Sequence, residues 1–312
     1  MVANAIETTN LTRRFGERTA VEDLTLAIPA GTVFGFLGPN GAGKTTTVRV
    51  LAALIAPSGG SAVVAGHRLG ADDAALRRSV GILTETPGLY DRLSARQNLV
   101  FFAEMYDLDR KTAEAQTERY LRLLGLWDRR DDAAGSFSKG MRQKLAIARA
   151  LLHDPAVVFL DEPTAGLDPQ AALTVRAFIR DLRSEGRTIF LTTHNLPEAD
   201  ELCDLVGIFK GRLLRLDTPA NLRAALFGRG TRVRVVGPPE PWLPTVQALP
   251  FARNVAIQGD ALAVNLDDPD SENPALVQAL LDAGARIRYV EPSAHSLEDV
   301  YLELLNEAVS EG

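Results

Sequence analysis

Cysteine, long apolar runs and a secretion signal are scarce or missing in this chain of 312 residues. Its single cysteine, Cys203, excludes an internal disulfide framework and is typical of a reducing cytoplasm. The longest apolar stretches, such as Val50 to Ala56, are far shorter than the roughly 20 residues needed to span a bilayer. Met1 to Asn10 has no basic segment followed by an apolar run, so we expect no signal peptide.

A concentrated positive charge is also missing. The formal net charge is -6, and the charge is unevenly spread. The segment from Thr231 onward holds five Arg and thirteen Asp or Glu, a net of -8, whereas the preceding residues hold 29 basic and 27 acidic side chains, a net of +2. Neither part has the clustered positive stripe that supports binding to a nucleic-acid backbone. We therefore expect no nucleic-acid partner.

The first positive signal is a glycine-rich segment. Gly38-Pro39-Asn40-Gly41-Ala42-Gly43-Lys44-Thr45 matches the phosphate-loop pattern G-x-x-x-x-G-K-[ST] in full, between a predicted strand over Thr32 to Leu37 and a predicted helix from Lys44. Glycines let the backbone wrap closely round phosphates, and the N-terminus of the helix adds a partial positive charge. We expect Lys44 to bridge the β- and γ-phosphates of a nucleotide and the Thr45 hydroxyl to ligate Mg²⁺.

Strand-like and helical patterns alternate over the first part of the chain, which favours an α/β fold with a mainly parallel sheet. Val157 to Leu160 and Thr188 to Thr192 predict two further buried strands. Asp161 follows the first of them at the carboxyl edge of the sheet, where ligands bind in open α/β folds, and we expect it to hold Mg²⁺. Glu162 faces the opposite way along an extended chain, and its carboxylate suits a general base.

A mostly helical stretch, residues 85–135, interrupts the strands and predicts a separate lobe. Within it, Ser94 followed by Gln97 predicts a capping box that opens a helix through Tyr106, and Lys111 to Leu124 predicts a second helix. After the lobe, Ser138 is expected to cap a helix over residues 139–153.

The pattern changes after Phe227, where Gly228-Arg229-Gly230 predicts a hinge. We expect residues 1–227 to form the first domain and residues 231–312 to form a small second domain. The second domain's predicted order is strand, helix, two strands, helix and strand, which indicates an α+β ferredoxin-like fold.

Two further segments carry the most specific signal, namely Phe137-Ser138-Lys139-Gly140-Met141-Arg142-Gln143 and Ala156-Val157-Val158-Phe159-Leu160-Asp161-Glu162-Pro163-Thr164-Ala165-Gly166-Leu167-Asp168-Pro169. Together with the phosphate loop they resemble the signature motif, Walker B strand and D-loop of the ATP-binding cassette (ABC) family. The resemblance covers Ile6 to about Phe227. It implies a P-loop NTPase (ABC ATPase) core with an inserted helical lobe, and ATP and Mg²⁺ as cofactors.

The resemblance also implies residue roles. Glu162 matches the glutamate that polarises the attacking water, and His194 matches the histidine that contacts the γ-phosphate; with Lys44 they are the expected catalytic residues. Phe15 stands where the family places an aromatic residue against adenine, although an ordinary core phenylalanine is the alternative. The expected nucleotide-binding residues are Phe15, Gly38, Pro39, Asn40, Gly41, Ala42, Gly43, Lys44, Thr45, Thr46, Glu85, Ser138, Gly140 and Asp168, and the expected metal ligands are Thr45, Glu85 and Asp161.

Pairing of two subunits follows from the same resemblance. In the family, the signature of one subunit covers the γ-phosphate on the Walker loop of the other, which assigns Ser138 and Gly140 to a partner's nucleotide and Asp168 to communication across the interface. The common signature is Leu-Ser-Gly-Gly-Gln, and this chain differs from it at three of five places. Glu85 replaces the family's Q-loop glutamine and adds a negative charge near a polyphosphate.

With these variant residues and the closing segment Ser296 to Tyr301, the chain resembles ATPases of the daunorubicin-exporter type. The implied partners are an integral-membrane permease and a second nucleotide-binding domain, in a homodimer or pseudo-dimer at the cytoplasmic face of the membrane. The implied cargo is a drug, an antibiotic or a lipid-like substrate. One alternative is a soluble ABC ATPase that acts on ribosomes or DNA without a permease. Another, a P-loop kinase or GTPase switch, leaves Ser138, Glu162 and Asp168 without a role.

Overall fold

Buried apolar strands form a parallel sheet at the centre of the first part of the chain in the computed structural model, which describes residues 3–84, 86–227, 229–292 and 296–310. The strand order is β10-β9-β3-β8-β7-β6. Neighbouring strands are parallel from β9 to β6, and β10 is antiparallel to β9. The strands are β3 (Val33–Leu37), β6 (Val80–Leu83), β7 (Val157–Asp161), β8 (Thr188–Thr193), β9 (Leu205–Lys210) and β10 (Arg212–Asp217).

Every residue of β3, β7 and β8 is buried, as expected for parallel strands covered on both faces. These are the three strands that the sequence predicts for the first part of the chain. The carboxyl ends of β3, β7 and β8 meet at one edge of the sheet because the three strands are adjacent and parallel. Residues that follow these strands are therefore brought together.

A second, antiparallel sheet was not predicted. Its order is β2-β1-β4-β5, formed by β1 (Asn4–Phe15), β2 (Arg18–Pro29), β4 (Gly59–Val64) and β5 (His67–Arg68). The strands β1 and β2 form a long hairpin that turns at Gly16, whose φ of +58° suits glycine. Its buried Ile6, Leu24 and Ile28 share one core cluster with the aromatic rings of β3. The expectation of a mainly parallel sheet thus describes only the central layer.

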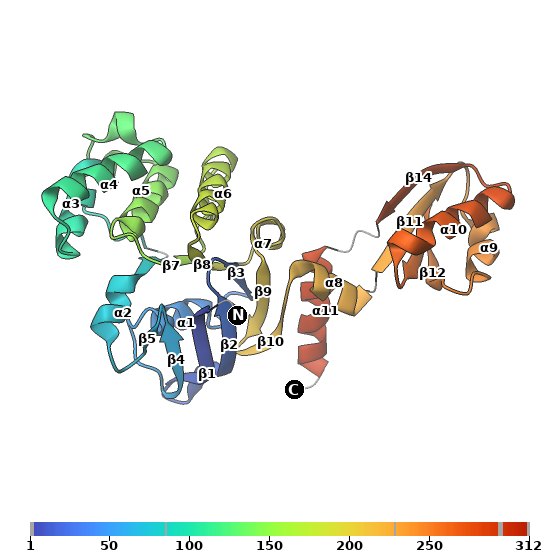
Figure 1. The fold of residues 1–312 in the computed structure, drawn as a ribbon, viewed down its shortest axis with the longest axis horizontal. Coiled ribbons are helices and arrows are strands. Elements are labelled where there is room, and N and C mark those ends of the chain that lie inside the picture. Colours follow the sequence, from blue (N-terminus) through green and yellow to red (C-terminus); the bar gives the residue numbers. More distant parts are fainter. Residues whose placement is uncertain (1–2, 85, 228, 293–295, 311–312) are drawn as a thin grey trace. The chain divides into compact units, whose positions relative to one another are not determined.

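Helices cover this part of the chain and build a lobe. Figure 1 shows α3, α4 and α5 side by side. The predicted capping box is present, because Ser94 accepts a hydrogen bond from the Gln97 amide and the Gln97 side chain accepts one from the Ser94 amide. The helices are α1 (Lys44–Leu51), α2 (Asp73–Ser79), α3 (Ala95–Met105), α4 (Arg110–Leu123), η1 (Trp127–Arg129), η2 (Ala134–Ser136), α5 (Lys139–Leu151), α6 (Pro169–Ser184) and α7 (Leu196–Leu202).

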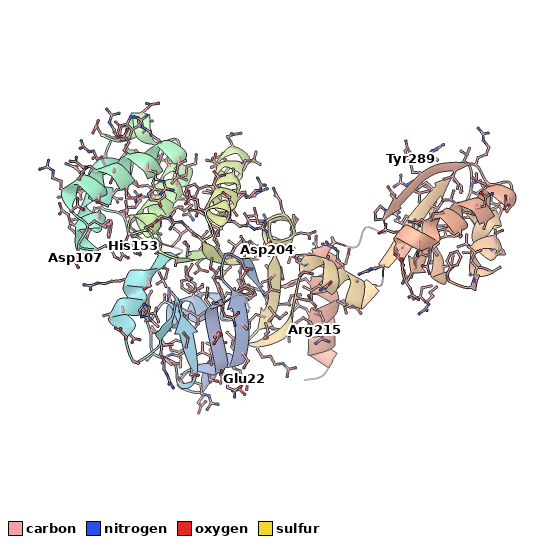
Figure 2. All side chains as sticks on the ribbon, in the orientation of Figure 1. Glu22, Asp107, His153, Asp204, Arg215 and Tyr289 are labelled. Carbon is pink, nitrogen blue, oxygen red and sulfur yellow. The ribbon has the colours of Figure 1, made fainter. Side chains whose placement is uncertain are left out.

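One histidine joins the lobe to the central sheet. The ring of His153, just after α5, stacks on Tyr106 at the end of α3, with 3.7 Å between the ring centroids. His153 is labelled in Figure 2. Its Nε2 lies 3.0 Å from the carbonyl oxygen of Val80 at the start of β6. The contact therefore holds the end of the first lobe helix against an edge strand of the sheet.

The chain divides into two compact units, Met1–Thr218 and Pro219–Gly312. The boundary lies before α8 (Pro219–Phe227), whereas the sequence placed it after Phe227. The reason is that α8 packs against α11 (Leu297–Ser310), a pairing between distant segments that local sequence patterns do not reveal. None of the helices in the described ranges has both the length and the apolar character required to cross a bilayer.

The second unit contains a four-stranded antiparallel sheet in the order β12-β13-β11-β14. Its elements follow the order strand, helix, strand, strand, helix, strand that the sequence predicts. One face of the sheet packs on α9 and α10 through apolar residues such as Val233, Leu262 and Leu276. Tyr289 on β14, labelled in Figure 2, is exposed. The elements are β11 (Arg229–Val235), η3 (Glu240–Trp242), α9 (Leu243–Gln247), β12 (Arg253–Gln258), β13 (Ala261–Leu266), α10 (Pro269–Asp282) and β14 (Ile287–Pro292).

Candidate active site

The phosphate loop connects β3 to α1 in a conformation that requires glycine. A Cβ atom at Gly38 would collide with the carbonyl oxygen of Phe209, and one at Gly43 would collide with the carbonyl oxygen of Ala20. Gly43 also has a φ of +107°, which L-residues avoid. The loop can therefore pass this close to its neighbouring strands only because these positions have no side chain.

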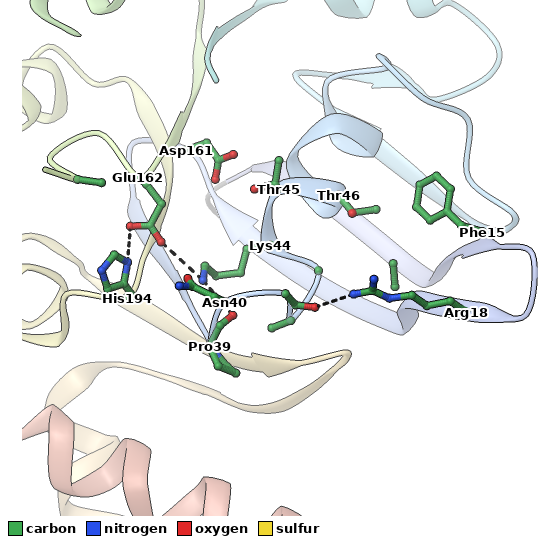
Figure 3. Close-up of a pocket in the computed structure, with 15 residues that line it drawn as sticks. Phe15, Arg18, Pro39, Asn40, Lys44, Thr45, Thr46, Asp161, Glu162 and His194 are labelled. Carbon is green, nitrogen blue, oxygen red and sulfur yellow. Dashed lines mark hydrogen bonds and ion pairs between the residues drawn. The ribbon is translucent and has the colours of Figure 1, made fainter. Parts of the chain in front are cut away.

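A cavity of about 600 Å³ opens beside this loop (Figure 3). Its lining comes from the phosphate loop and α1, the β1–β2 hairpin, and the segments that follow β7 and β8. The lining residues are Phe15, Arg18, Ala20, Pro39, Asn40, Gly41, Ala42, Gly43, Lys44, Thr45, Thr46, Asp161, Glu162, Ala165 and His194. Most of the residues that the sequence assigns to nucleotide binding thus line this one cavity.

Lys44 lines the cavity and is only 6% exposed. Its ammonium group donates to the carbonyl oxygens of Gly38, at 2.6 Å, and Pro39, at 3.3 Å. It also lies 3.6 Å from Glu162 Oε1. A buried ammonium needs such partners, and a phosphate oxygen can replace any of them. The loop therefore holds a positive charge at the place where phosphates would bind.

Asp161 is buried at the end of β7 and is 2% exposed. The Thr192 hydroxyl donates a hydrogen bond to its Oδ1, whereas its Oδ2 is buried and has no hydrogen-bond partner among the described residues. A buried carboxylate oxygen without a partner is costly unless a cation binds it. Asp161 and Thr45 face the same part of the cavity in Figure 3, and their oxygens are the ligand type that Mg²⁺ prefers. The donor set thus fits a magnesium ion.

Glu162 adopts a left-handed backbone conformation, with a φ of +50°. Its amide donates to the carbonyl and hydroxyl oxygens of Thr192, at 3.1 Å each, which holds it in this costly conformation. Its side chain points into the cavity, where Oε2 lies 2.8 Å from His194 Nδ1 (Figure 3). The Lys44 ammonium lies near the other carboxylate oxygen, Oε1. Glu162 therefore contacts both the lysine that follows β3 and the histidine that follows β8.

Phe15 ends β1 at the rim of the cavity, and 47% of it is exposed, so it is not a core residue. The Arg13 guanidinium covers one face of its ring at 4.4 Å from the centroid. Nearby Arg18, which the sequence analysis did not single out, also lines the cavity and donates to the Gly41 carbonyl oxygen at 3.3 Å. Its position three residues after Phe15 on the returning strand of the hairpin could have indicated it.

The signature residues and the D-loop aspartate do not line this cavity. Ser138 caps α5 by accepting a hydrogen bond from the Met141 amide, and Asp168 caps α6 by accepting one from the Ala171 amide. Both caps are exposed, and a Cβ at Gly140 would lie 3.7 Å from Asp168 Oδ2, so these residues form a second group. Glu85, predicted to contact nucleotide and metal, lies outside the described residues.

The α/β layers, and the glycine loop that places Lys44 near Glu162 in a cavity also lined by Asp161, define the class of the protein, a P-loop nucleotide-binding protein. The profile of the family described as ABC transporter matches residues 21–165. The chain belongs to this ABC transporter family, as the sequence motifs indicate.

Relatives and a solved structure support this assignment along most of the chain. The Nod factor export ATP-binding protein I of Burkholderia lata is 34% identical over 96% of this chain and 96% of its own length. The daunorubicin resistance ATP-binding protein DrrA3 of Streptomyces coeruleorubidus is 35% identical over 97% of this chain and 96% of its own length. The structure described as the ATP-binding subunit of an ABC transporter has a TM-score of 0.67 and 31% identity, and covers 72% of this chain and 94% of the other.

Proposed function

We propose that the chain binds and hydrolyses Mg-ATP as one of two paired nucleotide-binding subunits, and thereby energises a membrane exporter for drugs, antibiotics or lipid-like substrates. The observation that supports pairing is the separation of Ser138, Gly140 and Asp168 from the cavity that holds Lys44. In a pair, the exposed Ser138 at the signature of one subunit would face the cavity of the other. The Nod factor export and daunorubicin resistance relatives support export over action on ribosomes or DNA.

Several side chains around the cavity have distinct parts in this proposal. Lys44 and the loop amides bind the phosphates, and Phe15 stacks on the base. Thr45 and Asp161 would hold a magnesium ion, which would neutralise phosphate charge. Glu162 takes the proton of the attacking water, while His194 holds the carboxylate through its Nδ1 contact. Phosphates compete with Glu162 for the Lys44 ammonium, and this competition frees the carboxylate for that role.

The permease contact is proposed for the helical lobe. Tyr90, Phe101 and Met105 are exposed there, and the rings of Tyr90 and Phe101 pack with 5.0 Å between their centroids. An exposed apolar surface of this kind suits a short helix of a membrane partner. Nucleotide-dependent pairing would move two such lobes together, because the nucleotide adds contacts only in the paired state.

Trapping the pair tests this proposal. The Glu162→Gln variant keeps the size of the side chain but removes its basicity, so it should bind Mg-ATP, lose turnover by about 100-fold or more, and accumulate as a dimer. Light scattering after size exclusion, with and without Mg-ATP, measures the mass. The double variant Glu162→Gln with Ser138→Ala should bind nucleotide but pair more weakly.

Two outcomes decide against the proposal. A Glu162→Gln protein that stays monomeric in Mg-ATP, even when purified with a permease in detergent, contradicts pairing. Recovery of ribosomes or DNA in place of a permease, after affinity purification of the intact chain from its host, supports the alternative without a membrane partner.

A further inference from the structure

A buried carboxylate lies behind the cavity, and the roles described above do not use it. Glu198, in the first turn of α7, is 1% exposed and is absent from the cavity lining. Burying a carboxylate is unfavourable unless it gains hydrogen bonds and a nearby cation. Its partners therefore indicate what the group does.

Both partners of one carboxylate oxygen belong to the segments that carry Glu162 and His194. The Thr164 hydroxyl donates to Glu198 Oε2 at 3.0 Å, and the Thr193 hydroxyl donates to the same oxygen at 3.2 Å. Thr164 stands two residues after Glu162, and Thr193 directly precedes His194. A single oxygen thus joins the segment after β7 to the segment after β8.

The other oxygen, Oε1, faces α6. It lies 3.7 Å from Nε of Arg176, and it has no hydrogen-bond partner among the described residues. Arg176 also pairs with Glu201 at 3.2 Å. The helix α6 begins directly after Asp168, so Glu198 also links α7 to the helix that follows the D-loop. Burial raises the pKa of Glu198, while the two threonine hydroxyls and Arg176 lower it in part.

We propose that Glu198 is a positioning residue for ATP hydrolysis, which ties the two strand ends together and so sets the 2.8 Å contact between Glu162 and His194. This inference depends on the proposed function. Glu198 touches neither the cavity nor its contents and acts through Thr164 and Thr193. Loosening this link allows the two segments to shift, and misplacement of a catalytic group by about 1 Å can cost about 100-fold in rate.

Substitutions of Glu198 and Thr164 in the full chain test the inference. Glu198→Leu removes both hydrogen bonds and should lower kcat by about 10- to 100-fold while KM for ATP changes less than about twofold. Glu198→Gln keeps an oxygen that accepts from both hydroxyls, and should restore most of the rate. Thr164→Val removes one hydroxyl with little change in volume, so it should fall between these variants and also serves if Glu198→Leu fails to fold.

The matched control is Glu201→Gln on the same helix. Glu201 is more exposed and pairs with Arg176 and Arg180, and among the described residues neither ion pair involves the segments around Glu162 or His194. Its kcat should equal that of the unmodified chain. Thermal unfolding of every variant separates a loss of rate from a loss of fold.

The inference is overturned if Glu198→Leu or Thr164→Val turns over ATP at the unmodified rate. It is also overturned if ATP affinity, melting temperature and kcat fall together in Glu198→Leu and Glu198→Gln rescues none of them, because that result shows a purely structural role. An unmodified chain without ATPase activity would remove the proposed function and this inference together. Normal activity with unaffected variants removes this inference alone.

Discussion

Replacing Phe15 with alanine isolates the contribution of the base to nucleotide binding. The ring is 47% exposed, and Arg13 already covers one of its faces. A phenylalanine side chain has roughly 200 Å² of surface, so about 95 Å² faces solvent, and a base on the free face covers about half of that. At about 25 cal/mol per Å², the stacking is worth about 1 kcal/mol. We therefore expect Phe15→Ala to weaken ATP binding about fivefold, since about 1.4 kcal/mol is tenfold.

Isothermal titration of Mg-ATP into the Glu162→Gln background measures this loss without hydrolysis. Tripolyphosphate has no base, so its affinity should not change in Phe15→Ala. The Phe15→Tyr variant keeps the ring and should bind ATP like the unmodified protein. Equal weakening of tripolyphosphate and ATP would refute the stacking role, because it would show that the substitution disturbs the phosphate loop. An unchanged ATP affinity would refute it as well.

Two further predictions concern the loop and the fold. Gly43→Ala forces a Cβ against the Ala20 carbonyl oxygen at a φ of +107°, so it should abolish Mg-ATP binding and lower the melting temperature. Both effects should be larger than in Gly41→Ala, because Gly41 has a φ of +78° but a Cβ there meets no atom within 4 Å. Equal effects of the two substitutions in titration and thermal unfolding would contradict the steric argument. Burial lowers the pKa of His153 below its ordinary 6.5. The unfolded chain therefore binds more protons than the folded chain as the pH falls below about 6.5, and folding stability should decline there. His153→Phe keeps the stacking on Tyr106 and should flatten this decline in urea unfolding between about pH 8 and pH 5.5; an equally steep decline would show that another group controls it.

The sequence predicts the chemistry of the cavity better than its geometry. The spacing of the phosphate loop identifies Lys44 and Thr45 as phosphate-site residues, because a glycine loop of this pattern between a strand and a helix has few functions other than phosphate binding. Pattern alone also places Asp161 and Glu162 at the end of a buried strand. The left-handed conformation of Glu162 has no such signal, since it depends on hydrogen bonds to Thr192 on a neighbouring strand.

The features that the sequence misses either have a weak local pattern or depend on contacts between distant segments. The hairpin of β1 and β2 mixes buried and exposed residues irregularly, with several shifts of register, so its alternation is weak. It nevertheless places Phe15 and Arg18 at the cavity. The compact units divide before α8 and not after Phe227, because α8 contacts α11, a helix about seventy residues later in the chain.

Strand order explains why three chemically distinct groups converge. Lys44 follows β3, Glu162 follows β7 and His194 follows β8, and these strands are neighbours in the order β3-β8-β7. Because β8 lies between the other two, Thr192 at its end can bond both Asp161 and the Glu162 amide, while Thr193 can reach Glu198. A one-residue shift of β8 would break all of these contacts together, since alternate residues face opposite sides of a sheet. The register of this one strand therefore controls both the strained glutamate and the carboxylate that we propose positions it.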